Sequence, residues 1–381
     1  MQDPFTLQVA KREKFCDRDK EKAELLDHIR NNHHVVLSAK RKIGKSSLVE
    51  QVFNEIEQEG ILTVYADLFS VTSEKDFVSI FATSVVKGIG RGAADARSFQ
   101  AKVGALFTRI VPSLEFKPEG AKIEVRLDKA AGVNLLLEDL MDGLYKHVER
   151  IKQRVTVCLD EFQEITLLKE SKKIEGTLRS RIQFGENVSF LFVGSRRRIL
   201  KDMFNDKNKP FYKIAYPMDI AEIPREDFVA YIQERFKSTE KTCSPSVAGL
   251  IYDSVAGHTY YVQKLASLSW CGTELLCDEH TVRAAYKNLL KIEAATELEG
   301  VWKGLSLGQK SVMKALAKDP TKSPYSLEYS STYGLATGTI RRAIEALLSE
   351  DLVEISPDGT YEITNPVFRA WLNNMSSSID L

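Results

Sequence analysis

A basic loop between a buried strand and an amphipathic helix constrains the fold of this 381-residue chain more than any other feature. Residues 34–38 form a short β-branched run, and apolar residues recur at helical spacing over 48–56. Between them, residues 39–46 fit the pattern G-x-x-x-x-G-K-[ST] at every fixed position but the first, where Ala39 stands. Strand, loop and helix in this order are typical of a phosphate-binding loop, whereas a chance basic turn is the alternative interpretation.

The loop contains the groups that hold a nucleoside triphosphate. We expect main-chain N–H groups around Gly44 to converge on an anion, Lys45 to reach the β and γ phosphates, and the Ser46 hydroxyl to ligate Mg²⁺. If φ at the first position must be positive, Ala39 strains the loop. We therefore predict ATP and Mg²⁺ as ligands, and the predicted nucleotide-binding residues are Ala39, Lys40, Arg41, Lys42, Ile43, Gly44, Lys45, Ser46 and Ser47.

A second apolar run, at 155–159, ends at two carboxylates. Asp160 is expected to hold Mg²⁺ directly or through water, and Glu161 is expected to polarise the attacking water. An acidic pair at the end of a strand is weak evidence alone. Together with the upstream loop, it is the second of the two parts that ATP hydrolysis needs.

A third run, at 188–193, precedes Gly194, Ser195 and Arg196. If its strand lies beside the one that ends at Asp160, Ser195 or Arg196 can touch the γ-phosphate and report its loss. Three consecutive arginines are equally typical of a solvated surface. The predicted catalytic residues are Glu161, Lys45 and Arg196.

Strands alternate with helices over the first half of the chain, which predicts a doubly wound α/β sheet with ligands at the carboxyl ends of its strands. Strands are expected at 34–38, 62–67, 155–159 and 188–193, and helices at 17–29, 48–56, 76–107 and 133–148. An inserted hairpin is expected at 113–127, with its turn at 118–120. Residues past 216 carry helical periodicity, with helices expected at 227–236, 244–254, 259–276 and 279–294.

The last part of the chain has the pattern of a winged helix-turn-helix. Three helices are expected at 308–317, 326–333 and 337–350, followed by short strands at 353–355 and 361–363. The fold class is therefore α/β, a P-loop NTPase parallel sheet followed by a helical lid domain and a C-terminal winged helix-turn-helix domain. The predicted domains are residues 1–216, 217–298 and 299–381.

Charge and cysteine content restrict the partners and the compartment. The chain has 53 Lys or Arg and 53 Asp or Glu, so no global field draws it to nucleic acid or to an anionic membrane. It has no secretory leader pattern and no run of about 18 apolar residues. Its five scattered cysteines suit reduced thiols. We expect a cytoplasmic protein that does not enter the membrane.

The winged helix leaves its partner open. Residues 337–342 begin the expected recognition helix, where Thr and Arg side chains can contact phosphates and base edges. However, residues 301–381 contain eight Lys or Arg and nine Asp or Glu, whereas a DNA reader usually has a positive face. Double-stranded DNA, a protein partner, self-association and an intramolecular lock all remain candidates.

The chain resembles the archaeal-type ATPases of the AAA+/STAND superfamily, which also occur in bacteria. The resemblance covers nearly the entire chain and is carried by FCDRD at 15–19, KRKIGKSSL at 40–48, LDEFQ at 159–163, VGS at 193–195, KPFY at 209–212, GHTYYVQ at 257–263 and NPVFRAWL at 365–372. It implies that the helices after residue 216 form a lid over the nucleotide and that Gly257 and His258 face it. Residues 40–42 stand where the family usually has Pro-Arg-Arg, and Thr259 stands where it usually has Pro.

Two main hypotheses follow. In the first, ATP closes the helical lid, and hydrolysis or exchange repositions the winged helix, so that the protein is a nucleotide-driven switch. In the second, the protein is a DNA-binding regulator in which ATP is a structural ligand and turnover is negligible. A weaker third hypothesis is a protein-interaction scaffold with a degenerate loop. Glu161 discriminates between the first two, because only a switch needs its carboxylate.

Overall fold

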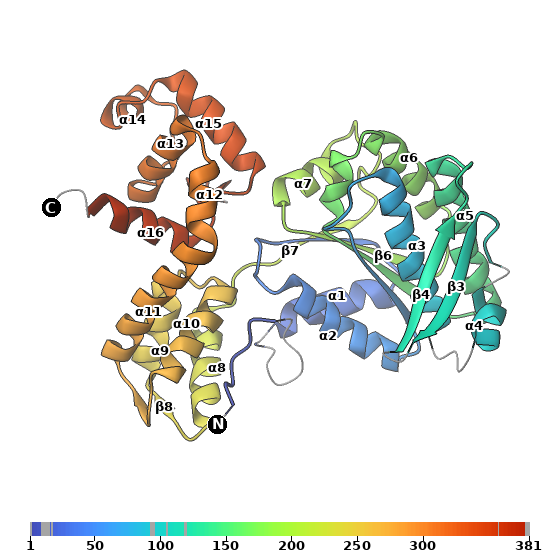
Figure 1. The fold of residues 1–381 in the computed structure, drawn as a ribbon, viewed down its shortest axis with the longest axis horizontal. Coiled ribbons are helices and arrows are strands. Elements are labelled where there is room, and N and C mark those ends of the chain that lie inside the picture. Colours follow the sequence, from blue (N-terminus) through green and yellow to red (C-terminus); the bar gives the residue numbers. More distant parts are fainter. Residues whose placement is uncertain are drawn as a thin grey trace. The chain divides into compact units, whose positions relative to one another are not determined.

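A five-stranded parallel sheet forms the centre of residues 18–221 in the computed structural model (Figure 1). The structure describes residues 2–8, 16, 18–91, 96–103, 106–117, 120–356 and 358–377. The strands lie in the order β2-β5-β6-β1-β7. Their bounds are β1 (Val35–Ser38), β2 (Leu62–Asp67), β5 (Val155–Asp160), β6 (Val188–Gly194) and β7 (Tyr216–Asp219). The predicted α/β class is confirmed.

Strand β7 was not expected from the sequence. It pairs with β1 at the edge of the sheet, and Met218 is its one buried residue. An edge strand with Pro217 in it lacks the continuous apolar run by which β1, β5 and β6 are recognised.

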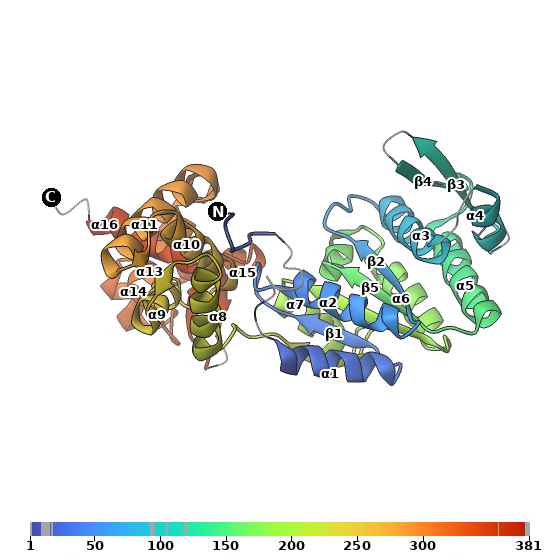
Figure 2. The same cartoon turned by 90° about the horizontal axis from the view of Figure 1, so that it is seen from below.

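Helices cover both faces of the sheet (Figures 1 and 2). The helices expected before and after β1 and before β5 are confirmed, with bounds α1 (Asp19–Arg30), α2 (Lys45–Gln58) and α5 (Val133–Ile151). Two further helices follow β5 and β6, namely α6 (Ser171–Ile182) and α7 (Arg197–Asn205). The single helix expected at 76–107 is two helices, α3 (Glu74–Gly90) and α4 (Ala96–Val103). Two glycines, Gly88 and Gly90, close α3, and glycine weakens a helix.

The inserted hairpin is also confirmed. Strands β3 (Ile110–Lys117) and β4 (Gly120–Leu127) pair antiparallel, and in Figure 2 they stand apart from the five-stranded sheet, beside α3 and α4. The turn was predicted at 118–120, of which residues 118 and 119 lie outside the described residues.

Residues 222–381 form a second compact unit, which begins with a helical part. Its helices are α8 (Arg225–Lys237), α9 (Pro245–Ser254), α10 (Thr259–Cys271) and α11 (Glu279–Glu293). Helix α10 therefore ends five residues before the predicted end at 276. Two strands of two residues each, β8 (Thr242–Cys243) and β9 (Leu276–Cys277), pair in parallel, and they are too short for a period of two to be detected.

The winged helix-turn-helix follows and is confirmed. A π-helical turn (Ala294–Leu298) and α12 (Glu299–Gly304) lead into α13 (Leu307–Lys318), α14 (Leu327–Thr332) and α15 (Thr337–Ser349). The wing consists of β10 (Val353–Ile355) and β11 (Tyr361–Ile363), paired antiparallel, and α16 (Pro366–Ser377) follows. Helix α13 starts with a capping box in which the side chains of Ser306 and Gln309 each bind the other's main-chain N–H.

The N-terminal segment belongs to this second unit. The ring of Phe5 is 4% exposed and lies edge-on to Tyr231 and Phe236, with centroids 6.4 Å and 5.7 Å away. Ser267 Oγ donates to Asp3 Oδ2 at 2.6 Å. The two units are thus residues 18–221 and residues 1–17 with 222–381, whereas the sequence-based division assigns residues 1–216 to one domain.

None of the five cysteines, all of which lie within the described residues, forms a disulfide. Within the described ranges, every helix is too short or too polar to cross a bilayer.

Candidate nucleotide-binding site

The predicted phosphate loop joins the end of β1 to the start of α2. Gly44 is the N-cap residue of α2 and has a φ of 105°, a left-handed conformation that glycine adopts without steric cost. As a glycine, this N-cap residue offers no side chain to the first main-chain N–H groups of α2. The strain considered for Ala39 is absent, because the positive φ of 60° falls on Lys42 instead.

The magnesium-binding residues predicted from two distant motifs lie side by side. Ser46 Oγ donates to Asp160 Oδ2 at 3.2 Å, although the two residues are 114 positions apart. Lys45 is 6% exposed and Asp160 is 5% exposed. A hydroxyl and a carboxylate are oxygen ligands of the kind that Mg²⁺ prefers.

Tyr65 is a site residue that the sequence did not single out. It lies on β2, opposite Cys158 of β5, and its hydroxyl donates to Asp160 Oδ2. Burial, with the charge of Glu161, raises the pKa of Asp160 and outweighs the hydrogen bond from Tyr65 and the charge of Lys45, which lower it. The sequence signal was the position of Tyr65 near the carboxyl end of a strand, but its partner depended on the strand order.

Glu161 is held in place by the neighbouring strand. Its Oε2 accepts from Ser195 Oγ at 2.8 Å, from Ser195 N at 3.3 Å and from Gln163 Nε2 at 2.5 Å. The two bonds from Ser195 require β6 beside β5, and that adjacency is confirmed. Gln163 was noted only as part of a family motif, so its contact was missed.

The conformation and the charge state of Glu161 both suit a reactive carboxylate. Its φ is 52°, an uncommon conformation for a residue other than glycine, and strain of this kind clusters at functional sites. The next residue, Phe162, is fully buried and anchors the turn. Burial acts to raise the pKa of Glu161, but the Lys45 ammonium and the hydrogen bonds from Gln163 and Ser195 together lower it.

The remaining predicted residues surround this centre or lie in the second unit. Arg196 is the N-cap residue of α7, and its Nη2 lies 4.0 Å from Glu164 Oε1. Its contact with a γ-phosphate stays a prediction. His258 is 8% exposed and precedes α10 in the second unit, so its contact with nucleotide stays a prediction as well. In the loop itself, Ile43 is buried, Lys40 and Ser47 are half-buried, and Arg41 and Lys42 are exposed.

Comparison with solved structures identifies this architecture. The chain is similar to a Walker-type ATPase of Pyrococcus abyssi, with a TM-score of 0.69 and 16% identity over 97% of this chain and 99% of that one. It is also similar to the ORC2 protein of Aeropyrum pernix in ADPNP and ADP complexes, with a TM-score of 0.54 and 14% identity over 95% and 94% of the two chains. A third similar structure is the Aeropyrum pernix ORC1 protein in complex with DNA, with a TM-score of 0.53 and 13% identity over 100% of both chains. The chain has the AAA+ ATPase fold.

The C-terminal part is identified independently. A family model described as a probable winged helix domain matches residues 296–374. No curated protein matches the chain. In fold, the resemblance to the archaeal-type ATPases is therefore confirmed, from the AAA+ sheet to the winged helix.

The candidate site fits magnesium and a triphosphate on its own geometry. The main-chain N–H groups at the start of α2 follow a glycine N-cap, and Lys45 is the first residue of that helix. Ser46 and Asp160 present two oxygens to a cation, and Glu161 directly follows Asp160 at the end of β5.

Proposed function

We propose that the protein is a Mg²⁺-dependent ATPase that works as a nucleotide-driven switch and contacts a partner through its winged helix. The observation that carries this proposal is the meeting of Ser46, Asp160 and Glu161 at the carboxyl ends of β1 and β5. Two motifs more than 100 residues apart bring together there the groups that ATP hydrolysis needs.

Each of these residues has a task that its geometry supports. The N–H groups near Gly44 and the Lys45 ammonium bind the phosphates, while Ser46 and Asp160 hold the metal. When bound, Mg²⁺ neutralises charge on the β and γ phosphates. All three hydrogen bonds to the Glu161 carboxylate fall on Oε2, so Oε1 is the oxygen that accepts a proton from the attacking water.

Ser195 connects this chemistry to the neighbouring strand. Its hydroxyl and main-chain N–H hold Glu161, and Arg196 follows directly. We propose that Arg196 leaves Glu164 to contact the γ-phosphate, because the present separation of 4.0 Å is a weak pairing. The lowered pKa of Glu161 keeps its carboxylate ionised near neutral pH, as a base requires.

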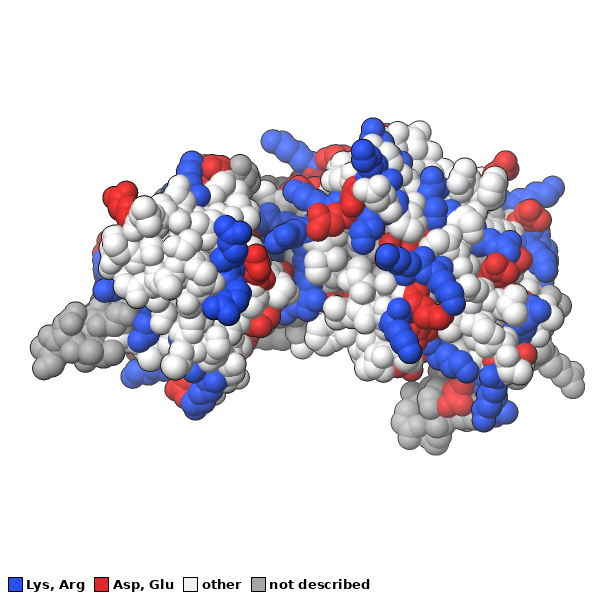
Figure 3. Space-filling view, turned by 90° about the horizontal axis from the view of Figure 1, so that it is seen from above, with Lys and Arg blue, Asp and Glu red and all other residues white. Residues whose placement is uncertain are grey.

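The charges on the described surface of this chain do not single out one kind of partner. Arg341 and Arg342 of α15 are exposed, and Arg342 and Thr339 line a groove of about 280 Å³ beside the start of α13. The Aeropyrum pernix ORC1 protein with a similar fold was solved with DNA, which motivates double-stranded DNA as one partner. However, Lys and Arg are interspersed with Asp and Glu on the face drawn in Figure 3. A mixed surface of this kind suits a protein partner or self-association as well as it suits DNA.

The alternative function is a DNA-binding regulator in which ATP is a structural ligand with negligible hydrolysis. Steady-state ATP turnover, measured with and without duplex DNA at one fixed salt concentration, separates the two. A switch hydrolyses ATP with Mg²⁺, and its Glu161→Gln variant does not. Turnover that stays at the Glu161→Gln background in the presence of Mg²⁺, DNA or both contradicts the switch and supports the regulator.

DNA as the partner is tested in the same assay. Stimulation of wild-type turnover by duplex DNA, lost in Arg342→Ala, supports DNA contact through α15. Indifference to DNA favours a protein partner.

A further inference from the structure

Arg18 lies where the chain crosses between its two compact units. One crossing is at residues 17–18 and the other is at residues 221–222. The Arg18 side chain is buried, at 2% exposure. A buried guanidinium needs acceptors for its fork of N–H groups.

Two of these acceptors are main-chain carbonyls from distant segments. Arg18 Nη2 donates to the Ile43 carbonyl at 2.9 Å, and Nη1 donates to the Ala221 carbonyl at 3.0 Å. Nη1 also binds Glu21 Oε1 at 2.9 Å, which orients the side chain. Ile43 belongs to the phosphate loop, and Ala221 is the last residue before the second unit. One rigid guanidinium therefore bridges the loop and both crossings.

The other end of the phosphate loop is tied to the same segment. Ser38 precedes the loop, and its carbonyl accepts from Ile220 N at 2.9 Å. Its hydroxyl donates to Asp219 Oδ1. Residues 219–221 are thus bound on one side to the start of the loop and on the other, through Arg18, to its end.

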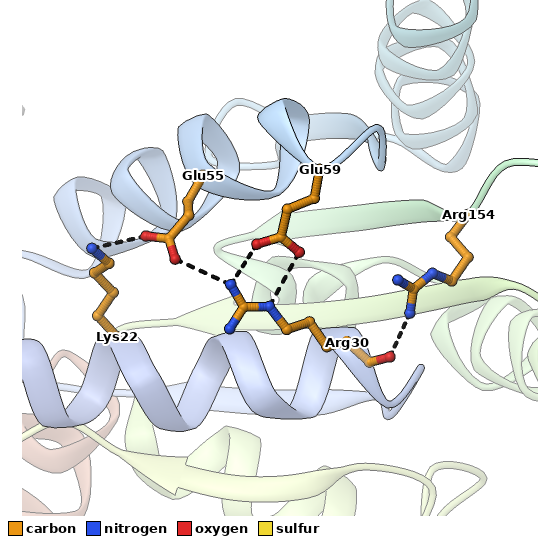
Figure 4. A network of polar contacts seen from close by, with 5 residues as sticks. All are labelled: Lys22, Arg30, Glu55, Glu59 and Arg154. Carbon is orange, nitrogen blue, oxygen red and sulfur yellow. Dashed lines mark hydrogen bonds and ion pairs between the residues drawn. The ribbon is translucent and has the colours of Figure 1, made fainter.

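Helix α1, which Arg18 precedes, is also fastened to α2. Lys22 pairs with Glu55 at 2.9 Å, Arg30 pairs with Glu55 at 3.2 Å, and Arg30 Nε donates to Glu59 at 3.1 Å (Figure 4). Arg154 donates to the Arg30 carbonyl. Each exposed pair contributes little alone, but the set makes α1 follow a displacement of α2.

We propose that Arg18 is a positioning residue that couples nucleotide on the phosphate loop to the segment 219–222 and so to the unit that contains the winged helix. A triphosphate that engages the N–H groups near Gly44 orients the peptides of the loop, the Ile43 carbonyl among them. Because the same guanidinium holds the Ala221 carbonyl, the two segments change conformation together. This proposal rests on the nucleotide-driven switch proposed above.

Hydrogen exchange with and without a non-hydrolysable ATP analogue and Mg²⁺ tests the coupling, with calorimetry of analogue binding on the same samples. In the wild-type protein, the analogue should slow exchange of the amides of 219–222 by roughly five-fold or more, the lower bound of ordinary allosteric coupling. In Arg18→Met, the analogue should still bind, but this slowing should vanish. Arg181→Met, which removes an arginine that pairs with Glu138 and Asp142 and touches neither carbonyl, should retain it.

Arg18→Lys keeps the charge but lacks the fork, so it should restore only part of the response and stands in if Arg18→Met does not fold. Three results overturn the proposal: no slowing at 219–222 in wild type although the analogue binds, full slowing in Arg18→Met, or full slowing in Arg18→Lys when Arg18→Met is unfolded. Absence of binding to the wild type is a different outcome, since it overturns the proposed function together with the coupling.

Discussion

Replacement of Glu161 by glutamine tests the chemistry proposed for the site. The change keeps the size of the side chain and leaves an amide oxygen to accept from Ser195 and Gln163, whose donors lie 2.5 Å to 3.3 Å from Oε2. It removes the ability to take a proton from water. Stability and nucleotide affinity should therefore change little, whereas turnover should collapse.

The expected size follows from the loss of a general base. Such a group contributes about 10²-fold to 10⁴-fold to the rate, which corresponds to roughly 3 to 5 kcal/mol of activation free energy. Because its pKa is lowered, the Glu161 carboxylate of the wild type is ionised near neutral pH and acts fully as a base. We thus expect kcat to fall by about 10²-fold or more, with the Kd for Mg-ATP within about tenfold of wild type.

Single-turnover hydrolysis and calorimetric binding measure both quantities. Glu164→Gln is the matched control, because it neutralises a nearby carboxylate that pairs with Arg196 and should spare the proton transfer. Retention of turnover within about tenfold of wild type in Glu161→Gln refutes the assigned role, and so does an equal loss in Glu164→Gln.

Two further perturbations concern Tyr65 and His34. Tyr65→Phe deletes a hydrogen bond to Asp160, so the free energy of unfolding without ligand should fall by about 1 to 3 kcal/mol. The fall should be smaller with Mg-ATP, because the metal then competes with the tyrosine for Asp160. His34 Nδ1 accepts from Phe190 N at 3.1 Å, and burial, followed by the charges of Arg179 and His33, lowers its pKa to about 4. In the unfolded chain, this imidazole binds a proton near pH 6.5. The contribution of neutral His34 to the free energy of unfolding is therefore complete above that pH and is lost as the pH falls toward 4. About 1 kcal/mol of the free energy of unfolding should be lost between pH 7.5 and 5.5, and His34→Gln should abolish this part of the pH dependence.

Urea unfolding measures both effects. Equal destabilisation of Tyr65→Phe with and without Mg-ATP contradicts competition between the tyrosine and the metal for Asp160. An unchanged pH dependence in His34→Gln contradicts a buried neutral imidazole at that position.

The sequence predicted the site where chemistry requires particular residue types at fixed spacing. Gly44, Lys45 and Ser46 were found from the loop, and Asp160 and Glu161 from the end of an apolar strand. Ser46 Oγ lies 3.2 Å from Asp160 Oδ2, so the structure brings the two motifs together, while the roles of their residues stay predictions. The α/β sheet and the winged helix were predicted equally well, because long runs with a clear hydrophobic period indicate directly which residues are buried.

Other features depend on tertiary neighbours and left no local pattern. Tyr65 reaches Asp160 only because β2 pairs with β5 in a register that aligns Asp67 with Asp160. β7 is an edge strand held by main-chain bonds to β1, and such bonds do not depend on side-chain type. Arg18 was noted within a motif, but its two carbonyl partners are 25 and 203 positions away.

Calorimetric titration of the purified protein with ATP and Mg²⁺ tests the central claim most directly. The wild type should bind Mg-ATP with measurable heat, and Lys45→Ala should weaken this binding by roughly ten- to 100-fold, the value of a charge-assisted contact to phosphate. Absence of heat with the wild-type protein, or an affinity that Lys45→Ala leaves unchanged, contradicts a triphosphate site at the start of α2.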